Sequence, residues 1–328
     1  MKTCYLDFDR TIQELAYPDT DINFLNENCI EFIKSVKELG YRLVLNTYRA
    51  DLMNGSLEQA LQSIASLVEF DEIAPIKITP QPFDLNIDTL FIDDESEGIP
   101  LKLSNKILGA KVIDFAKILA LLNLKQSEIK IGDQIWTNKN WNTKTFNNSE
   151  PILVAKSRRD WHNALINENP AICISLDYPD EVLYNWFAIN DERGIVPDGY
   201  RIPSTSDMNK LIDYLGGPKY AGVKLKATDW EECSYIEIDQ RERIKKFGNL
   251  TGFSAVPIGL RRPDGWYQGR MFGSFFWVIN DDSPAKPTVL KLIEGVEAAI
   301  LENTKQFESH TDFPITQHAF SIRLIKNT

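Results

Sequence analysis

Two carboxylates interrupt an apolar, strand-like run at the beginning of the sequence. Residues 5–8 predict a short buried strand, yet Asp7 and Asp9 stand where such a strand is ordinarily apolar. A buried, ionised carboxylate is costly unless a cation or a metal ion compensates its charge. The first part of the chain must therefore fold so that compensating groups gather around the end of this strand.

Two later apolar runs also end in polar residues. Residues 41–47 (YRLVLNT) have the apolar centre of a buried parallel strand and end at Thr47. Residues 89–94 (TLFIDD) close with the adjacent carboxylates of Asp93 and Asp94. Each ending is common by itself, because a strand-end threonine or a helix cap explains it. Three such endings in one region predict a shared site.

Helical patterns separate these runs. Apolar residues recur at helical spacing over residues 30–39, where Asn26 or Asn28 would cap the helix and Gly40 would end it, and again over residues 57–68. A strand near residues 111–113 and a helix from 115 to 122 would close this part. Alternation of strands and helices predicts an α/β doubly wound parallel sheet, with the polar residues at the carboxyl ends of its strands.

The polar strand ends resemble the motifs of haloacid dehalogenase-like (HAD) phosphatases. Residues 7–11 (DFDRT) resemble motif I, DxDx[TV], although Arg10 stands where glycine is usual. Thr47 resembles motif II, whose hydroxyl donates to a phosphoryl oxygen, and the Asp93–Asp94 pair resembles motif IV, which completes a magnesium site. The resemblance implies an HAD-like fold.

The same resemblance implies roles for individual residues. Asp7 would be the nucleophile that forms an aspartyl-phosphate, and Asp9 would protonate the leaving group and then activate water, with Thr47 completing the catalytic set. Hard oxygen ligands favour Mg2+, which offsets the charge of the phosphoryl oxygens. The implied metal ligands are Asp7, Asp9 (through its backbone carbonyl), Asp93 and Asp94, and the implied phosphate-binding residues are Thr11, Thr47, Arg49 and, more weakly, Lys77.

One motif is missing from this pattern. Motif III is a lysine shortly before the Asp93–Asp94 pair, but residues 82–91 contain no Lys or Arg. Lys77, upstream of this stretch, and Lys102, just beyond the Asp93–Asp94 pair, are the two lysines that could take the place of the motif III lysine. The short intervals between motifs leave room for a crossover helix but not for a cap domain.

A domain boundary is predicted near residue 124. All of the tryptophans lie beyond it, at Trp136, Trp141, Trp161, Trp186, Trp230, Trp266 and Trp277. We therefore expect an HAD-like domain over residues 1–124 and an α+β domain over residues 125–328, with one clear helix that begins near Ser204 or Ser206 and ends at Gly216.

The second domain resembles another family. Its segments IGDQIW (131–136), LYNWFA (183–188), GYRIPS (199–204) and FSIRLI (320–325) are similar to those of the Fibrobacter succinogenes major paralogous (FISUMP) domain. That resemblance implies a C-type lectin-like fold. The apolar pattern over residues 289–300 predicts an inserted helix. The nearby residues that form either a ligand surface or an ordinary hairpin are Arg261, Trp266, Tyr267 and Arg270.

The net charge and the composition limit the classes of binding partner that we expect. A net charge of −11 argues against sequence-independent nucleic-acid binding, and the basic run at Arg241, Arg243, Lys245 and Lys246 is interpreted as a solvated face. No apolar run is long enough for a membrane span, and no signal peptide fits before the first strand. The scattered cysteines predict free thiols and a cytoplasmic protein.

Two main functions follow from these patterns. The first is a magnesium-dependent phosphohydrolase, acting on a phosphorylated small molecule or macromolecule, with an appended lectin-like module whose ligand is unknown. The alternative is a non-catalytic ligand- or receptor-binding protein that uses an HAD-like scaffold. A third treats the whole chain as a recognition protein of a phage or mobile element.

Overall fold

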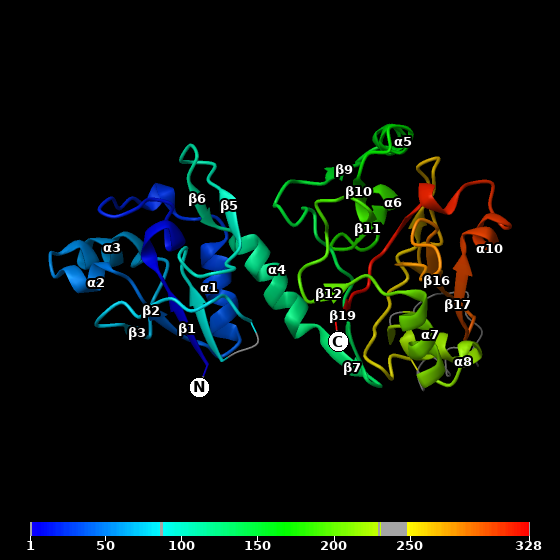
Figure 1. Cartoon of the computed structure of the whole chain (residues 1–328), viewed down its shortest axis with the longest axis horizontal. Helices are drawn as coiled ribbons and strands as arrows, with labels where there is room; N and C mark the ends of the chain where they lie inside the picture. The colour runs from blue at the N-terminus through cyan, green and yellow to red at the C-terminus, as the bar shows by residue number, and fades with distance from the viewer. Residues whose placement is uncertain (1, 86–87, 229, 231–247, 328) are drawn as a thin grey trace. The chain divides into compact units, whose positions relative to one another are not determined.

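The computed structural model describes residues 2–85, 88–228, 230 and 248–327. The chain forms two compact units, Met1–Lys125 and Gln126–Thr328 (Figure 1). The basic run predicted to be a solvated face and the cysteine at position 233 lie outside the described residues.

The first unit is built on a four-stranded parallel sheet with strand order β3-β2-β1-β4. Its strands are β1 (Thr3–Leu6), β2 (Arg42–Leu45), β3 (Glu72–Ile73) and β4 (Thr89–Ile92). Leu6 at the end of β1 is in register with Leu45 in β2 and with Ile92 in β4. Strands β2, β1 and β4 therefore end side by side, and the residues that follow them share one edge of the sheet.

Helices separate the strands along the chain. They are the π-helical turn η1 (Phe8–Ile12), the 3-10 turn η2 (Ile22–Phe24), α1 (Cys29–Glu38), α2 (Arg49–Leu52), α3 (Ser56–Ile64) and α4 (Phe115–Gln126). Apolar side chains of α1, α3 and α4 pack with the strands in one buried core.

The predicted cap of α1 is wrong. Asn28 precedes the helix with a left-handed φ of 62° and makes no side-chain cap. Asn26 instead donates to the backbone carbonyls of Thr11 and Ile113. Its amide therefore links segments distant in sequence, which a local capping pattern does not reveal.

The strand at Lys111–Ile113 forms outside the parallel sheet. As β6 it pairs antiparallel with β5 (Leu101–Leu103) in a separate two-stranded sheet. Such a hairpin needs only a short loop, whereas joining the parallel sheet would need a crossover connection.

The described residues of the second unit form three antiparallel-rich sheets. Their strand orders are β14-β13-β18-β11-β10-β9, β12-β19-β8-β7 and β15-β16-β17. The strands are β7 (Glu128–Ile131), β8 (Gln134–Thr137), β9 (Leu153–Val154), β10 (Ala171–Ile174), β11 (Val182–Asn185), β12 (Tyr200–Arg201), β13 (Leu260–Arg261), β14 (Tyr267–Gln268), β15 (Gly273–Val278), β16 (Thr288–Ile293), β17 (Ala299–Asn303), β18 (Ala319–Phe320) and β19 (Ile325–Lys326). Strands from both ends of the unit meet where β19 pairs with β8, with Ile325 opposite Trp136.

Short helices complete this unit. They are α5 (Arg158–Ile166), α6 (Trp186–Ile189), α7 (Thr205–Tyr214), α8 (Pro218–Leu225), α10 (Thr304–Glu308) and the 3-10 turn η4 (Ile315–Gln317). The helix predicted from Ser204 is α7, where Ser204 and Asp207 form a capping box. Trp136 and Trp186 are buried, as large aromatics in a core should be.

The helix predicted over residues 289–300 is wrong. This stretch forms β16 and the beginning of β17, which pair antiparallel with each other. Val289, Leu290 and Leu292 are all fully buried. A strand covered on both faces is continuously apolar, so its periodicity does not distinguish it from a buried helix.

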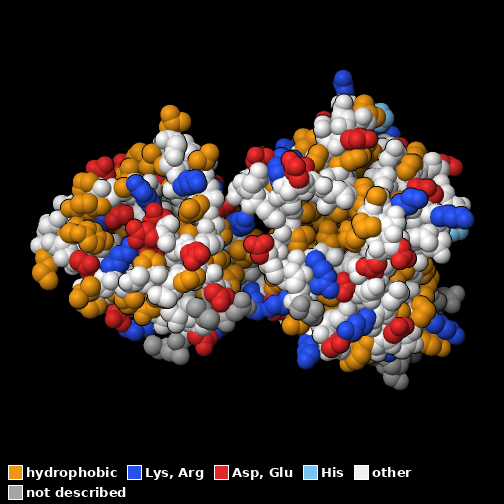
Figure 2. Space-filling view, in the orientation of Figure 1, with side chains coloured by type: hydrophobic (Ala, Val, Ile, Leu, Met, Phe, Trp, Pro, Cys, Tyr) orange, Lys and Arg blue, Asp and Glu red, His pale blue; other side chains and the backbone are white. Residues whose placement is uncertain are grey.

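Both units present charged surfaces. Figure 2 shows acidic and basic side chains interspersed with hydrophobic ones on the visible face of each unit. Within the part of the chain that the structure describes, every helix is too short or too polar to cross a bilayer.

Candidate functional site

Three carboxylates meet at the carboxyl edge of the parallel sheet. Asp7 directly follows β1, and Asp93 and Asp94 directly follow β4, which is hydrogen-bonded to β1. One carboxylate oxygen from each residue lies within 4.8 Å of the others. Asp7 and Asp93 are 3% and 1% exposed, so their charges require compensation from nearby groups.

Lys77 supplies positive charge to this cluster. Its Nζ lies 3.1 Å from Asp93 Oδ2 and 3.8 Å from Asp7 Oδ1. Lys102, the other alternative, is paired with Glu27 at 2.8 Å. Of the two lysines considered, Lys77, in the loop after β3, therefore lies beside the carboxylates, whereas Lys102 pairs with Glu27.

Side chains near the end of β2 position this loop. Asn46 holds the backbone of Ile78 through two bonds: its Nδ2 donates to the carbonyl at 2.9 Å, and its Oδ1 accepts from the N–H at 2.7 Å. The backbone N–H of Lys77 donates to Asp51 Oδ1 at 2.9 Å. Sequence reasoning selected Thr47 and missed Asn46, although its polar side chain at a buried strand end was a usable signal.

The electrostatics of the cluster reflect its burial. Burial raises the pKa of Asp7 well above its usual range, and the Asp93 carboxylate raises it further, while Lys77 opposes both effects. Burial and then Asp93 raise the pKa of Asp94 to about 6. Burial lowers the pKa of Lys77, but the carboxylates of Asp7 and Asp93 outweigh it and raise that pKa above its ordinary value.

The donor set fits a hard divalent cation. Asp7, Asp93 and Asp94 offer three carboxylate groups with converging oxygens. Among the described residues, Lys77 pairs with Asp7 and Asp93, and the positive charge of Arg10 lowers the pKa of Asp94. These two cations are fewer than the three carboxylates. Oxygen-only ligands around a net negative site are those that Mg2+ prefers.

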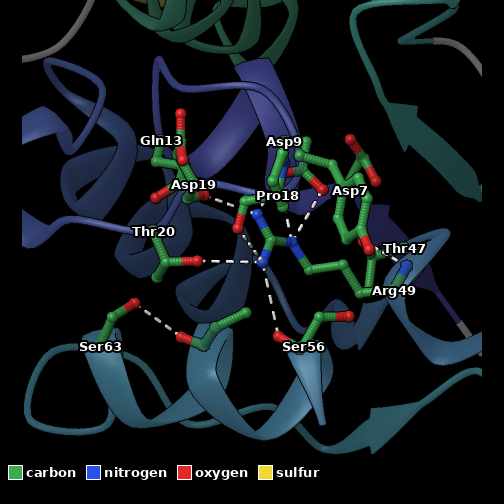
Figure 3. A network of polar contacts seen from close by, with 12 residues as sticks. Asp7, Asp9, Gln13, Pro18, Asp19, Thr20, Thr47, Arg49, Ser56 and Ser63 are labelled. Carbon is green, nitrogen blue, oxygen red and sulfur yellow. Dashed lines mark hydrogen bonds and ion pairs between the residues drawn. The ribbon is translucent and has the colours of Figure 1, made fainter. Parts of the chain in front are cut away.

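The Asp9 carboxylate points to a different partner. Arg49 Nε donates to Asp9 Oδ1 and Oδ2 at 3.2 and 3.0 Å, and Arg49 Nη2 donates to Oδ1 at 2.6 Å (Figure 3). The Asp9 side chain is not part of the cluster formed by Asp7, Asp93 and Asp94.

Arg49 was predicted to bind phosphate, and its surroundings assign it other partners. Its side chain is fully buried, and its guanidinium packs against the rings of Phe8 and Tyr17, with centroid distances of 5.1 and 5.4 Å. Nη2 also donates to the Asp19 carbonyl at 2.7 Å, and Nη1 donates to Thr20 Oγ1 at 2.9 Å.

The two predicted phosphate-binding threonines are buried near the cluster's strands. Thr47 is the second residue after the end of β2, and its Oγ1 accepts from the backbone N–H of Arg49 at 3.4 Å. Thr11 lies in η1, and its buried Oγ1 makes no hydrogen bond within the described ranges. Both hydroxyls thus retain a donor hydrogen that these bonds do not use.

The ligand surface predicted in the second unit is only partly a surface. Arg261 is 2% exposed and donates to the carbonyls of Ala155 and Ser157, so its assignment to a surface is wrong. Arg270 forms a salt bridge with Asp177, and Trp266 remains 60% exposed. The Arg261 guanidinium is held inward by these carbonyl acceptors and packs against the rings of Trp161 and Tyr267.

Tyr267 is partly buried as well. Its hydroxyl donates to the Ile174 carbonyl at 2.8 Å, which ties β14 to β10. The guanidinium of Arg158 lies over the Trp266 ring, 4.5 Å from its centroid. Of the predicted surface, Trp266 therefore keeps the largest exposed area.

Comparison with known proteins identifies the second unit. No curated protein and no solved structure matches the chain significantly. The family model described as the Fibrobacter succinogenes major domain matches residues 129–326, which is more than half of the chain and lies within the second unit. The chain therefore belongs to the Fibrobacter succinogenes major domain family.

Proposed function

We propose that the first unit is a magnesium-dependent phosphohydrolase and that the second is an appended lectin-like binding module. The observation that carries the proposal is the convergence of Asp7, Asp93 and Asp94, with Lys77 Nζ 3.1 Å from Asp93. The HAD-like motifs of the sequence contain the same carboxylates. A buried strand-end cluster of this kind is a candidate functional site because its pKa values are strongly perturbed.

In this proposal Asp7 is the nucleophile. One of its oxygens attacks phosphorus, the bond from phosphorus to the leaving-group oxygen breaks, and Asp9 delivers a proton to that oxygen. Asp9 then takes a proton from water, whose oxygen displaces the Asp7 carboxylate and releases inorganic phosphate. Lys77 offsets negative charge beside Asp7 throughout.

Asp7, Asp93 and Asp94 would hold Mg2+, with the backbone carbonyl of Asp9 as a further ligand. Bound Mg2+ supplies charge neutralisation for the phosphoryl oxygens. The hydroxyl of Thr47 would donate to one of those oxygens. The remaining positioning comes from the parallel strands, which fix where Asp7 and Asp93 emerge.

The test is hydrolysis of 4-nitrophenyl phosphate by the full chain, with Mg2+ and with EDTA. Wild type should release phosphate only with Mg2+, and Asp7→Asn should abolish release because the amide is isosteric but not nucleophilic. Asp88→Asn is a matched control, because Asp88 is exposed and lies at the opposite end of β4 from Asp93. Wild type that is inactive on aryl and alkyl phosphates would contradict the proposal.

A non-catalytic binding protein is the second candidate. The pairing of the Asp9 carboxylate with buried Arg49 favours it, because a buried ion pair inside the unit is also explained by a purely structural role. This candidate predicts that Mg2+ raises the melting temperature while no phosphate is released from any ester tested.

We also propose a reducing, cytoplasmic environment. The described cysteines, Cys4, Cys29 and Cys173, are buried free thiols. Burial raises the pKa of each thiol, which keeps it protonated and unreactive. Thiol titration of the native and unfolded chain would test this, since Cys4, Cys29 and Cys173 should react only after unfolding.

A further inference from the structure

The buried side chain of Arg49 has no donor left for a substrate. A guanidinium has five N–H donors. Nε binds Asp9, and Nη2 binds both Asp9 and the Asp19 carbonyl. Nη1 is within hydrogen-bond distance of Thr20 Oγ1, the Pro18 carbonyl and the Ser56 carbonyl, at 2.9, 3.4 and 3.5 Å.

These partners come from separate parts of the first unit. Arg49 begins α2 and is separated from the end of β2 by three residues, Asp9 lies in η1 after β1, and residues 18–20 belong to the loop between η1 and η2. Figure 3 shows Arg49 between Asp9 on one side and Thr20 and Ser56 on the other. One side chain thus connects Asp9 to this loop.

The contacts leave part of the Asp9 carboxylate available. Asp9 Oδ1 accepts from both Nε and Nη2 of Arg49, whereas Oδ2 accepts only the Nε bond at 3.0 Å. Because the two oxygens are held by a planar, fully buried guanidinium, the carboxylate has one fixed orientation. Oδ2 keeps lone pairs that can face a reacting group.

We propose that Arg49 is a positioning residue that orients Asp9 for proton transfer and makes its position depend on residues 18–20. This role rests on the proposed phosphohydrolase function. It replaces the prediction that Arg49 binds phosphate. Binding a phosphoryl group would require the guanidinium to leave Asp9 or the loop, and its burial leaves little room for that movement.

The experiment is steady-state kinetics of the full chain with Mg2+, using 4-nitrophenyl phosphate and glycerol 2-phosphate. The variants are Arg49→Met, Arg49→Lys, Asp9→Asn and the double variant Asp9→Asn/Arg49→Met. Arg42→Met is the matched control, because Arg42 lies on β2 with its side chain 38% exposed and pairs with exposed Glu72.

Arg49→Met should lower kcat for the aryl ester about 100-fold, the loss expected when a catalytic group is displaced by about 1 Å. KM should change less than about threefold, because Arg49 does not contact substrate. The loss should be larger for glycerol 2-phosphate, whose alkoxide leaving group depends more on a proton donor. In the Asp9→Asn background, Arg49→Met should cause no further loss.

Arg49→Lys should recover part of kcat, because an ammonium keeps the charge but not the planar fork. If Arg49→Met does not fold, kcat for the two esters is compared in Arg49→Lys and Thr20→Val instead. A KM increase with unchanged kcat would overturn the inference and restore a phosphate-binding role. The inference would also be overturned if the losses in kcat caused by Asp9→Asn and by Arg49→Met multiply in the double variant. Inactive wild type would instead refute the proposed function itself, before any variant is compared.

Discussion

Replacing Lys77 with methionine tests how the carboxylate cluster is compensated. Methionine keeps much of the aliphatic length of lysine and the backbone N–H that donates to Asp51, and it removes the ammonium. That ammonium lies 3.1 Å from Asp93 Oδ2 and 3.8 Å from Asp7 Oδ1. The substitution therefore leaves buried carboxylates that repel one another without their cation.

The expected loss of stability follows from these distances. At an effective dielectric constant of about 20, the ammonium attracts Asp93 by about 5 kcal/mol and Asp7 by about 4 kcal/mol before desolvation. Removing one partner of a buried ion pair costs about 3–5 kcal/mol after desolvation is included. Since Lys77 is 17% exposed, we expect the lower end, about 3 kcal/mol at pH 8.

The assay is urea and thermal unfolding of the full chain in EDTA at pH 8 and pH 5. A loss of about 3 kcal/mol lowers the melting temperature of a unit of this size by about 10 °C. The loss should be smaller at pH 5, because the raised pKa of Asp7 lets it take up a proton and so remove one uncompensated charge. Mg2+ should restore part of the stability at pH 8.

Lys102→Met is the matched control. Lys102 pairs with Glu27, whose side chain is 62% exposed, so its removal should cost less than about 1 kcal/mol. If Lys77→Met destabilises the chain no more than Lys102→Met, or if its loss is independent of both pH and Mg2+, the compensation argument is refuted.

Three further predictions concern single side chains. Asp7→Asn should raise the free energy of unfolding in EDTA at pH 8, because burial raises the pKa of Asp7 and its ionisation opposes folding; a decrease measured in urea would contradict this. Burial lowers the pKa of His318 from 6.5 to about 4, so the unfolded chain binds its proton first and stability should fall by about 3 kcal/mol from pH 6.5 to pH 4. His318→Gln should flatten that decrease in acid unfolding curves, and His162→Gln, at an exposed position, should not. Arg261→Met should cost about 3 kcal/mol in urea unfolding, because it strands buried carbonyls, whereas Trp266→Ala at an exposed position should cost less than about 1 kcal/mol.

The local pattern of apolar and polar residues was sufficient to place the carboxylates of the site. Asp7 and Asp93 follow apolar runs short enough to be strands, and parallel strands in register bring their ends to one edge. The helix from Thr205 to Tyr214 was equally readable, since Ser204 and Asp207 carry the whole capping signal within four residues. The family of the second unit was also recognisable from its short motifs.

Only the tertiary structure showed which cationic side chain lies beside which carboxylate. Lys77 reaches Asp93 because Asn46 and Asp51 fix the loop that carries it, and such contacts across loops leave no periodic signal. Arg49 follows Thr47 in the sequence as a phosphate-binding residue would, but Asp9 and Asp19 take up its guanidinium. The order of motifs cannot show which acceptors surround a side chain.

Strands that are buried on both faces were also not predictable from the sequence pattern. Residues 289–300 satisfied a helical pattern, yet β16 lies between β15 and β17 with both of its faces largely buried. Val289 and Leu290 point to opposite faces and are both fully buried, and Lys291 is the one polar residue between positions 289 and 293, so a period of two is not marked. Sequence by itself determined where polar groups interrupt apolar runs, because that depends on neighbours along the chain. The structure decided which charges meet and which runs become strands, because those outcomes depend on neighbours in space.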